Sequence, residues 1–295
     1  MSLKAEKVKL FAKWGKANRK MALELEHPTR GSFELDPLKF TKRVRVKTFD
    51  VNGFYGVTIN GSYPKNAHIL MLPGGAYTLE PTERTREIGE YLAVNEGFKV
   101  SIFQYPLSPE YTALNAHECL MEAYSSLRKE YPEDDFFLFG DFSGGGLALS
   151  FLQELRDKGE LPMPVKTAVV SPWLDIALEN PKIKLFQKTD DILPLEALRE
   201  VGRKYCGPLE KDHPMVSPLY GDWNGLGPIL IFSGTEEILT PDCELLAEKA
   251  GKLEGTEIIY KKGAGMFHDW IKVPSKETDR TFKLICSFLK DEEWE

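Results

Sequence analysis

The chain has 295 residues, of which 42% are hydrophobic, so it is long enough to bury a large core within a single domain spanning residues 1–295. Its formal net charge of -7 gives no electrostatic footprint for nucleic acid, and the basic run at residues 182–188 is short and interrupted. The charge therefore argues against nucleic acid and against acidic membrane surfaces as partners.

Nothing in the sequence indicates export, membrane insertion or a metal site. Residues 1–26 mix Lys and Glu with apolar residues and contain no continuous apolar stretch, so they predict neither a signal peptide nor a membrane span. The cysteines are far apart without a Cys-x-x-Cys pair, which predicts reduced, buried thiols rather than disulfides or a zinc site. They are Cys119, Cys206, Cys243 and Cys286. We expect a cytoplasmic protein with no metal and no cofactor.

The chain begins with helical and then strand-like patterns. Helix formers with an apolar stripe at roughly 3.6-residue spacing predict an amphipathic helix over residues 8–25. Residues 43–49 and 54–59 alternate in polarity around an Asn-Gly turn, which predicts an antiparallel hairpin.

Apolar segments then alternate with helical patterns, which implies an α/β fold with a largely parallel sheet covered by helices on both faces. The strand candidates are residues 68–72, 99–103, 136–139, 167–171, 229–232 and 257–260. The helix candidates are residues 113–129, 145–158, 241–253 and 275–289. Residues 176–220 change to charged, Pro-punctuated segments around a helix near 195–205, and with residues 1–35 they are expected to form a small helical cap.

The most informative stretch is Gly-Asp-Phe-Ser-Gly-Gly-Gly at residues 140–146, between an apolar strand candidate and a helical pattern. Strand, tight turn and helix are the context of a hydrolase nucleophile elbow, which needs glycine two places before and after the nucleophile. Gly140 and Gly144 satisfy this rule around Phe142, whereas centring the turn on Ser143 would put Asp141 where glycine is wanted. The register predicts Phe142 at the apex, its ring in the pocket mouth, and Ser143 as a displaced candidate nucleophile.

Three other loops follow predicted strands, at the sheet edge where open α/β sheets bind ligands. Gly74 and Gly75 could direct N–H groups toward an oxyanion, Glu237 offers a carboxylate, and His268 an imidazole. Each alone has an ordinary explanation as a glycine-rich turn, a solvated carboxylate or a structural histidine. Together, oxyanion loop, elbow, acid and histidine follow the chain order of α/β-hydrolase triads.

From about residue 68 onward the chain resembles the hormone-sensitive-lipase-like carboxylesterases, an α/β-hydrolase group often labelled acetyl esterase or lipase. Residues 104–110, Gln-Tyr-Pro-Leu-Ser-Pro-Glu, are similar to the family's Asp-Tyr-Arg-Leu-Ala-Pro-Glu, and residues 171–175 match its Ser-Pro-Trp-x-Asp. Val-Ser-Pro-Leu-Tyr at 216–220, Gly-Thr-x-Glu at 234–237 and Gly-Met-Phe-His ending at His268 also match. The resemblance implies the α/β-hydrolase fold: a mostly parallel twisted sheet with an antiparallel N-terminal hairpin.

The resemblance also implies roles for single residues. The family's acid maps onto Glu237, its base onto His268, its oxyanion glycines onto Gly74 and Gly75, and its nucleophile onto Phe142. An intact member transfers the acyl group of a small carboxylic ester to serine, the histidine moves the proton, and water then releases the acid. Because phenylalanine has no nucleophilic atom, catalysis should be reduced or absent.

Two functions therefore stay open. One is a carboxylesterase impaired at the nucleophile, acting weakly through Ser143 if at all; the other is a non-catalytic protein that binds a small apolar ligand. The expected partner is a small ester or apolar molecule, and the sequence is also compatible with a homodimer.

Overall fold

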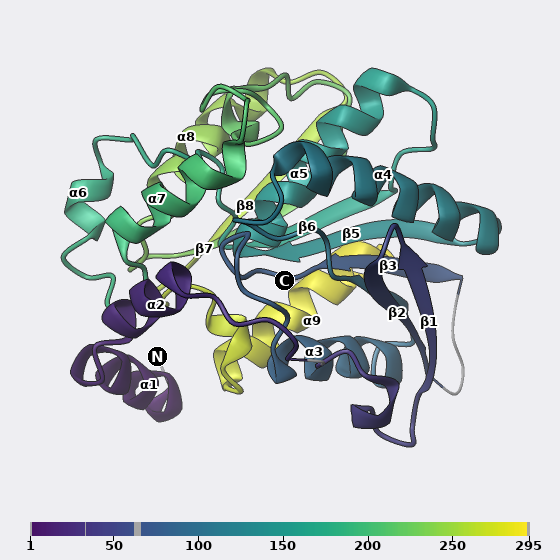
Figure 1. Ribbon diagram of the computed structural model, residues 1–295, viewed down its shortest axis with the longest axis horizontal. Coiled ribbons are helices and arrows are strands. Elements are labelled where there is room, and N and C mark those ends of the chain that lie inside the picture. The colour runs from purple at the N-terminus through teal and green to yellow at the C-terminus, as the bar shows by residue number, and fades with distance from the viewer. Residues whose placement is uncertain (1, 33, 62–65, 294–295) are drawn as a thin grey trace.

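The computed structural model, which describes residues 2–32, 34–61 and 66–293, is built around one eight-stranded sheet with helices on both faces (Figure 1). The strand order is β1-β2-β4-β3-β5-β6-β7-β8. The strands are β1 Arg45–Val51, β2 Phe54–Asn60, β3 Ala67–Leu72, β4 Lys99–Phe103, β5 Asp135–Asp141, β6 Lys166–Val170, β7 Gly227–Gly234 and β8 Thr256–Gly263. Each predicted strand corresponds to one of these.

The sheet begins with an antiparallel hairpin. β1 pairs antiparallel with β2 in a register that brings Val51 opposite Phe54, and β2 pairs antiparallel with β4. Asn52 and Gly53, which connect β1 to β2, have φ of 54° and 86°, the left-handed conformation that tight hairpin turns require. The remaining neighbours pair in parallel, so the predicted mostly parallel sheet with an antiparallel N-terminal edge is confirmed.

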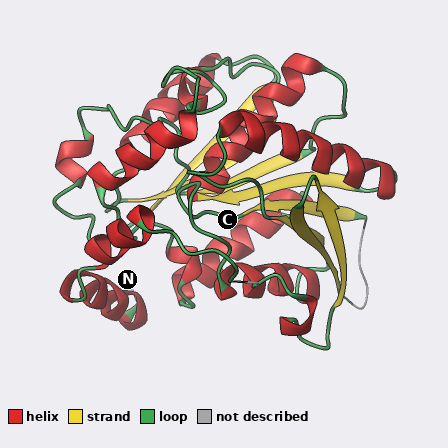
Figure 2. Ribbon diagram, in the orientation of Figure 1, coloured by secondary structure: helices red, strands yellow, loops and turns green. Residues whose placement is uncertain are grey.

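Helices cover the sheet on both sides, and each side has its own apolar core (Figures 1 and 2). One core joins the sheet to α4, α5, α7 and α8, and the other joins it to α3 and α9. The helices of eight residues or more are α1 Leu3–Trp14, α2 Ala17–Glu26, α3 Glu83–Val94, α4 Ala113–Glu130, α5 Phe142–Lys158, α7 Leu195–Cys206, α8 Thr240–Lys249 and α9 Lys276–Lys290. The short helix α6 is Ile183–Phe186.

The structure corrects three local predictions. The single helix expected over residues 8–25 is two helices, because Gly15 ends α1 and Lys16 adopts a left-handed φ of 53° before α2. Helix α3 is absent from the sequence-based prediction, because charged residues separate the apolar residues of its buried face. A Thr82–Thr85 capping box fixes its start. Helix α5 begins at Phe142 rather than at residue 145.

The two segments expected to form a cap lie side by side at one end of the molecule (Figure 1). Helix α2 packs on α7, and the Asn18 N–H donates to the Asp191 carbonyl over 3.2 Å. Residues 1 and 33 of the segment 1–35 lie outside the described residues.

The predicted reduced, buried state of the four cysteines is confirmed. Within the described ranges, no helix is long and apolar enough to cross a membrane.

The turn from β5 into α5 is packed so closely that glycine is required on both sides of it. A Cβ on Gly140 would lie 2.5 Å from the Gly144 carbonyl oxygen, and one on Gly144 would lie 1.9 Å from the Leu72 carbonyl oxygen. Real Cβ atoms do not approach backbone atoms so closely, so the turn keeps its shape only with these glycines.

Gly144→Ala should therefore destabilise the protein by about 3 kcal/mol, the upper part of the range for overpacked sites, because a backbone oxygen cannot move aside easily. Gly251→Ala is the matched control, since a Cβ there meets nothing within 4 Å and should change stability by less than about 0.5 kcal/mol. Urea unfolding of both variants measures the difference. Equal stabilities would show that the turn tolerates a side chain.

Candidate active site

The loops that follow β3, β5, β6, β7 and β8 meet at the carboxyl edge of the sheet. They bring together Gly74 and Gly75, Phe142, Ser171, Glu237 and His268 respectively. These residues are far apart in the sequence, and the parallel pairing of the strands aligns the strand ends that carry them.

Phe142 lies at the apex of the turn between β5 and α5. Its φ is 48°, a left-handed conformation that is unusual for a bulky residue and costs on the order of 1–3 kcal/mol. Its ring stacks on Trp173 with centroids 5.4 Å apart, and meets the His268 imidazole edge to face at 4.4 Å. Only 2% of the residue is exposed. The ring is therefore enclosed within the site rather than projecting into a pocket mouth as expected, because Trp173 and His268 cover it.

Ser143 is fully buried, and its hydroxyl lies beneath the Gly74–Gly75 loop. The Gly75 N–H donates to Ser143 Oγ over 3.1 Å, and the Tyr105 hydroxyl lies 3.4 Å from the same oxygen. Among the described residues, His268 is not a hydrogen-bond partner of Ser143. The structure thus does not bring the candidate nucleophile Ser143 together with the candidate base.

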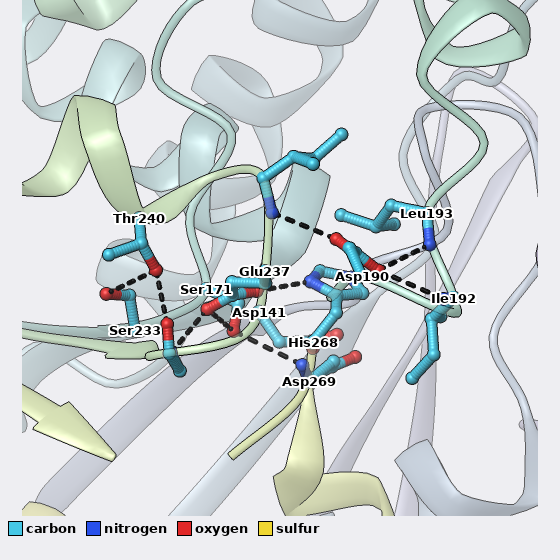
Figure 3. A network of polar contacts seen from close by, with 12 residues as sticks. Asp141, Ser171, Asp190, Ile192, Leu193, Ser233, Glu237, Thr240, His268 and Asp269 are labelled. Carbon is cyan, nitrogen blue, oxygen red and sulfur yellow. Dashed lines mark hydrogen bonds and ion pairs between the residues drawn. The ribbon is translucent and has the colours of Figure 1, made fainter. Parts of the chain in front are cut away.

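His268 and Glu237 form a buried hydrogen-bonded pair (Figure 3). His268 Nδ1 lies 2.7 Å from Glu237 Oε2. The other carboxylate oxygen accepts from the Ser171 hydroxyl at 2.9 Å and from the Gly234 N–H at 2.6 Å. With both carboxylate oxygens occupied, the imidazole is held in one orientation, with Nδ1 toward the acid and Nε2 as its remaining nitrogen.

A second buried carboxylate, Asp190, joins the segment 176–220 to the loop that carries Glu237 (Figure 3). It accepts hydrogen bonds from the N–H groups of Ile192, Leu193 and Ile238, at 3.0, 2.9 and 2.9 Å. Burial raises the pKa of Asp190 to about 6, although these N–H groups and the charge of His268 oppose the shift.

The pKa of His268 is raised above the usual value for histidine. Burial by itself lowers this pKa, but the hydrogen bond to Glu237 and its negative charge outweigh burial, and Asp269 and Asp190 act in the same direction. The site is therefore built to favour a protonated imidazole, as a general base requires after it has accepted a proton.

A buried cluster of charges lies immediately behind the apex of the turn. Lys272 Nζ forms ion pairs with Asp141 at 2.6 Å and with Asp269 at 2.9 Å. Burial and the charge of Asp269 raise the pKa of Asp141 to about 6, against the attraction of Lys272. The cluster joins the residue before Phe142 to the residue after His268, so it fixes the two loops relative to each other.

The loop after β3 is held in a strained conformation. Ala76 and Tyr77 have φ of 54° and 56°, and a Cβ on Gly74 would lie 2.3 Å from the Asp141 carboxylate. The Tyr105 hydroxyl donates to the Pro73 carbonyl at 2.8 Å, and the Arg30 guanidinium donates to the Thr78 carbonyl at 2.6 Å. These contacts, with that of Ser143, keep the Gly74 and Gly75 amides beside the turn.

Some of these residues were given no role by the sequence. Ser171 and Tyr105 belong to motifs that marked the family, so their positions were visible although their partners were not. Asp190 and Lys272 carry no recognisable pattern, and only the fold shows what they contact. Among the described residues, no cluster of three or more His, Cys, Asp or Glu could hold a metal ion.

Comparison with known proteins adds independent information. A family described as the alpha/beta hydrolase fold matches residues 69–272. An acetyl-hydrolase of Streptomyces hygroscopicus is 34% identical over 203 residues, covering 68% of this chain and 67% of the relative. An esterase of Acinetobacter venetianus is 29% identical over 229 residues, covering 77% of this chain and 75% of the relative.

Solved structures agree in fold. An esterase from the bacterial hormone-sensitive lipase family is 25% identical, with a TM-score of 0.78 over 94% of this chain and 98% of that one. A hormone-sensitive lipase from a metagenome library is 24% identical and superposes with a TM-score of 0.83, over 99% of this chain and 100% of that one.

The pKa of His268 should depend on Glu237. Glu237→Gln removes the negative charge that raises the pKa of His268, while the burial that lowers this pKa remains. The pKa of His268 should therefore fall below the reference value of about 6.5. Because the folded pKa is raised in the parent, the pair stabilises the fold fully below pH about 6.5, and this contribution is lost as pH rises through the folded pKa. NMR titration of the imidazole, assigned with His268→Asn, measures the pKa.

Glu236→Gln is the matched control, because Glu236 pairs with Lys9 and makes no hydrogen bond to His268. It should leave the titration of His268 nearly unchanged. If both variants shift the pKa equally, Glu237 has no special influence on the histidine.

Proposed function

The chain belongs to the α/β-hydrolase-fold family of esterases and acetyl hydrolases, and we propose that it is a carboxylesterase-type member whose acyl transfer is blocked at the nucleophile. One observation carries the proposal: the residue at the apex of the strand–helix turn, with its left-handed φ of 48°, is Phe142, and its ring contacts the imidazole of His268. A triad serine would have to occupy this position to pass its proton to the histidine.

The remaining parts of acyl-transfer chemistry are supported by their contacts. Glu237 orients His268 through Nδ1, so Nε2 is the nitrogen that would accept a proton from a serine and return it to the leaving alcohol. The backbone amides of Gly74 and Gly75 lie beside the turn. The Gly74 amide is suited to bind the oxyanion, whereas the Gly75 amide donates to Ser143 Oγ and would have to leave that partner to contribute. In this proposal the attacking oxygen is the missing part of the catalytic triad.

Ser143 does not supply that oxygen in our proposal. Its hydroxyl accepts the Gly75 N–H, so it serves as a brace for the proposed oxyanion loop. Turning Ser143 toward His268 would leave a buried N–H without a partner, a cost of about 1–3 kcal/mol, and the Phe142 ring contacts the imidazole there.

We also propose that the segments 1–35 and 176–220 act as the cap of this site. The contact of α2 with α7 joins the two segments. The hydrogen bond from the Ile238 N–H to Asp190 joins the segment 176–220 to the loop that carries Glu237. His268 is only 5% exposed, which is consistent with a covered site.

Restoring the nucleophile tests the proposal. Phe142→Ser should raise hydrolysis of p-nitrophenyl acetate or butyrate by at least about 100-fold over the parent, a fraction of the roughly 10^6 that loss of a triad serine costs elsewhere. Adding His268→Ala to Phe142→Ser should remove the gain. Phe142→Ala is the control, because it opens the site without adding an oxygen and should give no gain in hydrolysis. Thermal unfolding of each variant verifies folding, because removing a buried aromatic ring costs about 3–5 kcal/mol.

The opposite assignment makes a different set of predictions. If folded Phe142→Ser stays inactive while Ser143→Ala abolishes a measurable parent rate, then Ser143 is the nucleophile. Labelling of Ser143 in the parent by a fluorophosphonate probe would point the same way.

A second function, binding of a small apolar ligand without turnover, is favoured by a cleft next to the site. The cleft measures about 740 Å³, and its apolar lining includes Leu35, Phe54, Tyr55, Leu107 and Tyr111. It shares Tyr105 with the site, because the Tyr105 hydroxyl also contacts Pro73 and Ser143. A volume of this size is typical of small-molecule sites.

The uncharged fluorophore N-phenyl-1-naphthylamine should bind in this cleft and raise the melting temperature of the protein. Tyr111→Ala should weaken the binding by about 5- to 10-fold, the effect of one aromatic contact. Tyr220→Ala is the control, because Tyr220 is also a half-exposed tyrosine but lies outside the cleft. Equal binding by the two variants would place the fluorophore elsewhere.

A further inference from the structure

Helix α1 carries an exposed apolar stripe, of which only Leu10 also borders a cleft against residues 188–191. Leu3, Leu10, Phe11 and Trp14 are 79%, 53%, 76% and 81% exposed. At 3.6 residues per turn they fall within an arc of roughly 100°, opposite the side where Ala5 is buried. None of the four belongs to the apolar cores of the described residues.

The opposite face of α1 is anchored to the rest of the molecule. Lys9 forms an ion pair with Glu236, and the Ser2 hydroxyl donates to Glu277 of α9 over 2.6 Å. Helix α1 lies at the edge of the molecule beside α2 (Figure 1). The stripe of Leu3, Leu10, Phe11 and Trp14 is therefore presented outward by a helix that is fixed in place.

The surroundings of the stripe are positively charged. Lys4, Lys7 and Lys13 are exposed on α1, and the two helices together contain six Lys or Arg against three Glu. The whole chain has a net charge of -7, so this region is opposite in sign to the average surface. The net charge of the whole chain therefore does not describe the charge of this region.

We propose that α1 is an interfacial helix that docks the protein onto an anionic lipid surface. Trp, Phe and Leu on one arc would enter the boundary between headgroups and acyl chains. Lys4 and Lys13 at the sides of the arc would contact anionic headgroups, and Lys7, which lies within the arc, would reach them with its extended side chain. A second copy of the chain fits this face less well, because a two-fold interface would bring the lysines of one helix against those of the other.

Docking in this orientation has a consequence for the site. Lys9 pairs with Glu236, the residue immediately before Glu237, so α1 is attached to the loop that carries the acid. A lipid surface held by α1 would therefore lie on the side of the molecule that carries the proposed cap. The inference goes beyond the proposed function, and its test involves no hydrolysis.

Flotation with lipid vesicles tests the inference. The protein should bind phosphatidylglycerol-containing vesicles at low ionic strength, bind pure phosphatidylcholine vesicles much less, and detach in about 1 M NaCl, where the Debye length is about 3 Å. Phe11→Ala with Trp14→Ala should lower the partition coefficient at least about 10-fold. Neutralising Lys4, Lys7 and Lys13 to Gln should lower it by about 100-fold.

Matched controls separate the helix from general surface effects. Leu38→Ala removes another highly exposed apolar side chain, outside α1, and should leave binding unchanged. Changing Lys129, Lys249 and Lys252 to Gln removes the same total charge from other exposed positions and should have less than about a threefold effect. Unchanged melting temperatures show that all variants are folded.

Three results would overturn the inference. The first is absence of binding to anionic vesicles at low salt, and the second is an equal loss of binding in the test and control variants. The third is a dimer, measured by sedimentation, that Phe11→Ala with Trp14→Ala converts to a monomer without any vesicle binding in the parent; the stripe would then be an interface between copies.

Discussion

The close approach of β5, α5 and the loop after β3 determines the shape of the turn at Phe142 and the position of the Gly74–Gly75 loop beside it. A Cβ at Gly144 would meet the Leu72 carbonyl, and one at Gly140 would meet the carbonyl of Gly144 itself. The backbone must therefore turn sharply, and the residue between these glycines adopts a left-handed φ whatever its side chain. The same packing places the Gly75 amide within hydrogen-bond distance of Ser143.

Phenylalanine at this turn changes the chemistry without changing the backbone. The strain of the left-handed φ is opposed by burial of the ring, which stacks on Trp173 and contacts His268. Burying a Phe side chain is worth about 1.5–3 kcal/mol, comparable to the strain at the turn. A turn that in an esterase presents a reactive oxygen is here filled by part of an aromatic cluster that also includes Tyr77 and Tyr205.

The polar part of the site remains ordered beside that cluster. Glu237 has partners on both oxygens, and Asp190 and Lys272 join neighbouring loops through buried contacts. Such networks restrict each group to one arrangement, because a buried polar group that loses its partner is costly. The histidine is therefore held in place by the fold itself and does not depend on a nucleophile for its position.

The sequence by itself determined the positions of the strands along the chain, the antiparallel hairpin and the spacing of glycines around Phe142, because each depends on periodicity or on local steric limits. It could not determine the direction of the Ser143 hydroxyl, the enclosure of the Phe142 ring, or the pairing of Lys272 with Asp141. Those depend on loops far apart in the chain, whose relative positions only the sheet defines. The sequence could not show that the apolar stripe of α1 is exposed, for the same reason. The pattern of residues 8–25 predicts an apolar stripe, but only packing decides which side of a helix is covered.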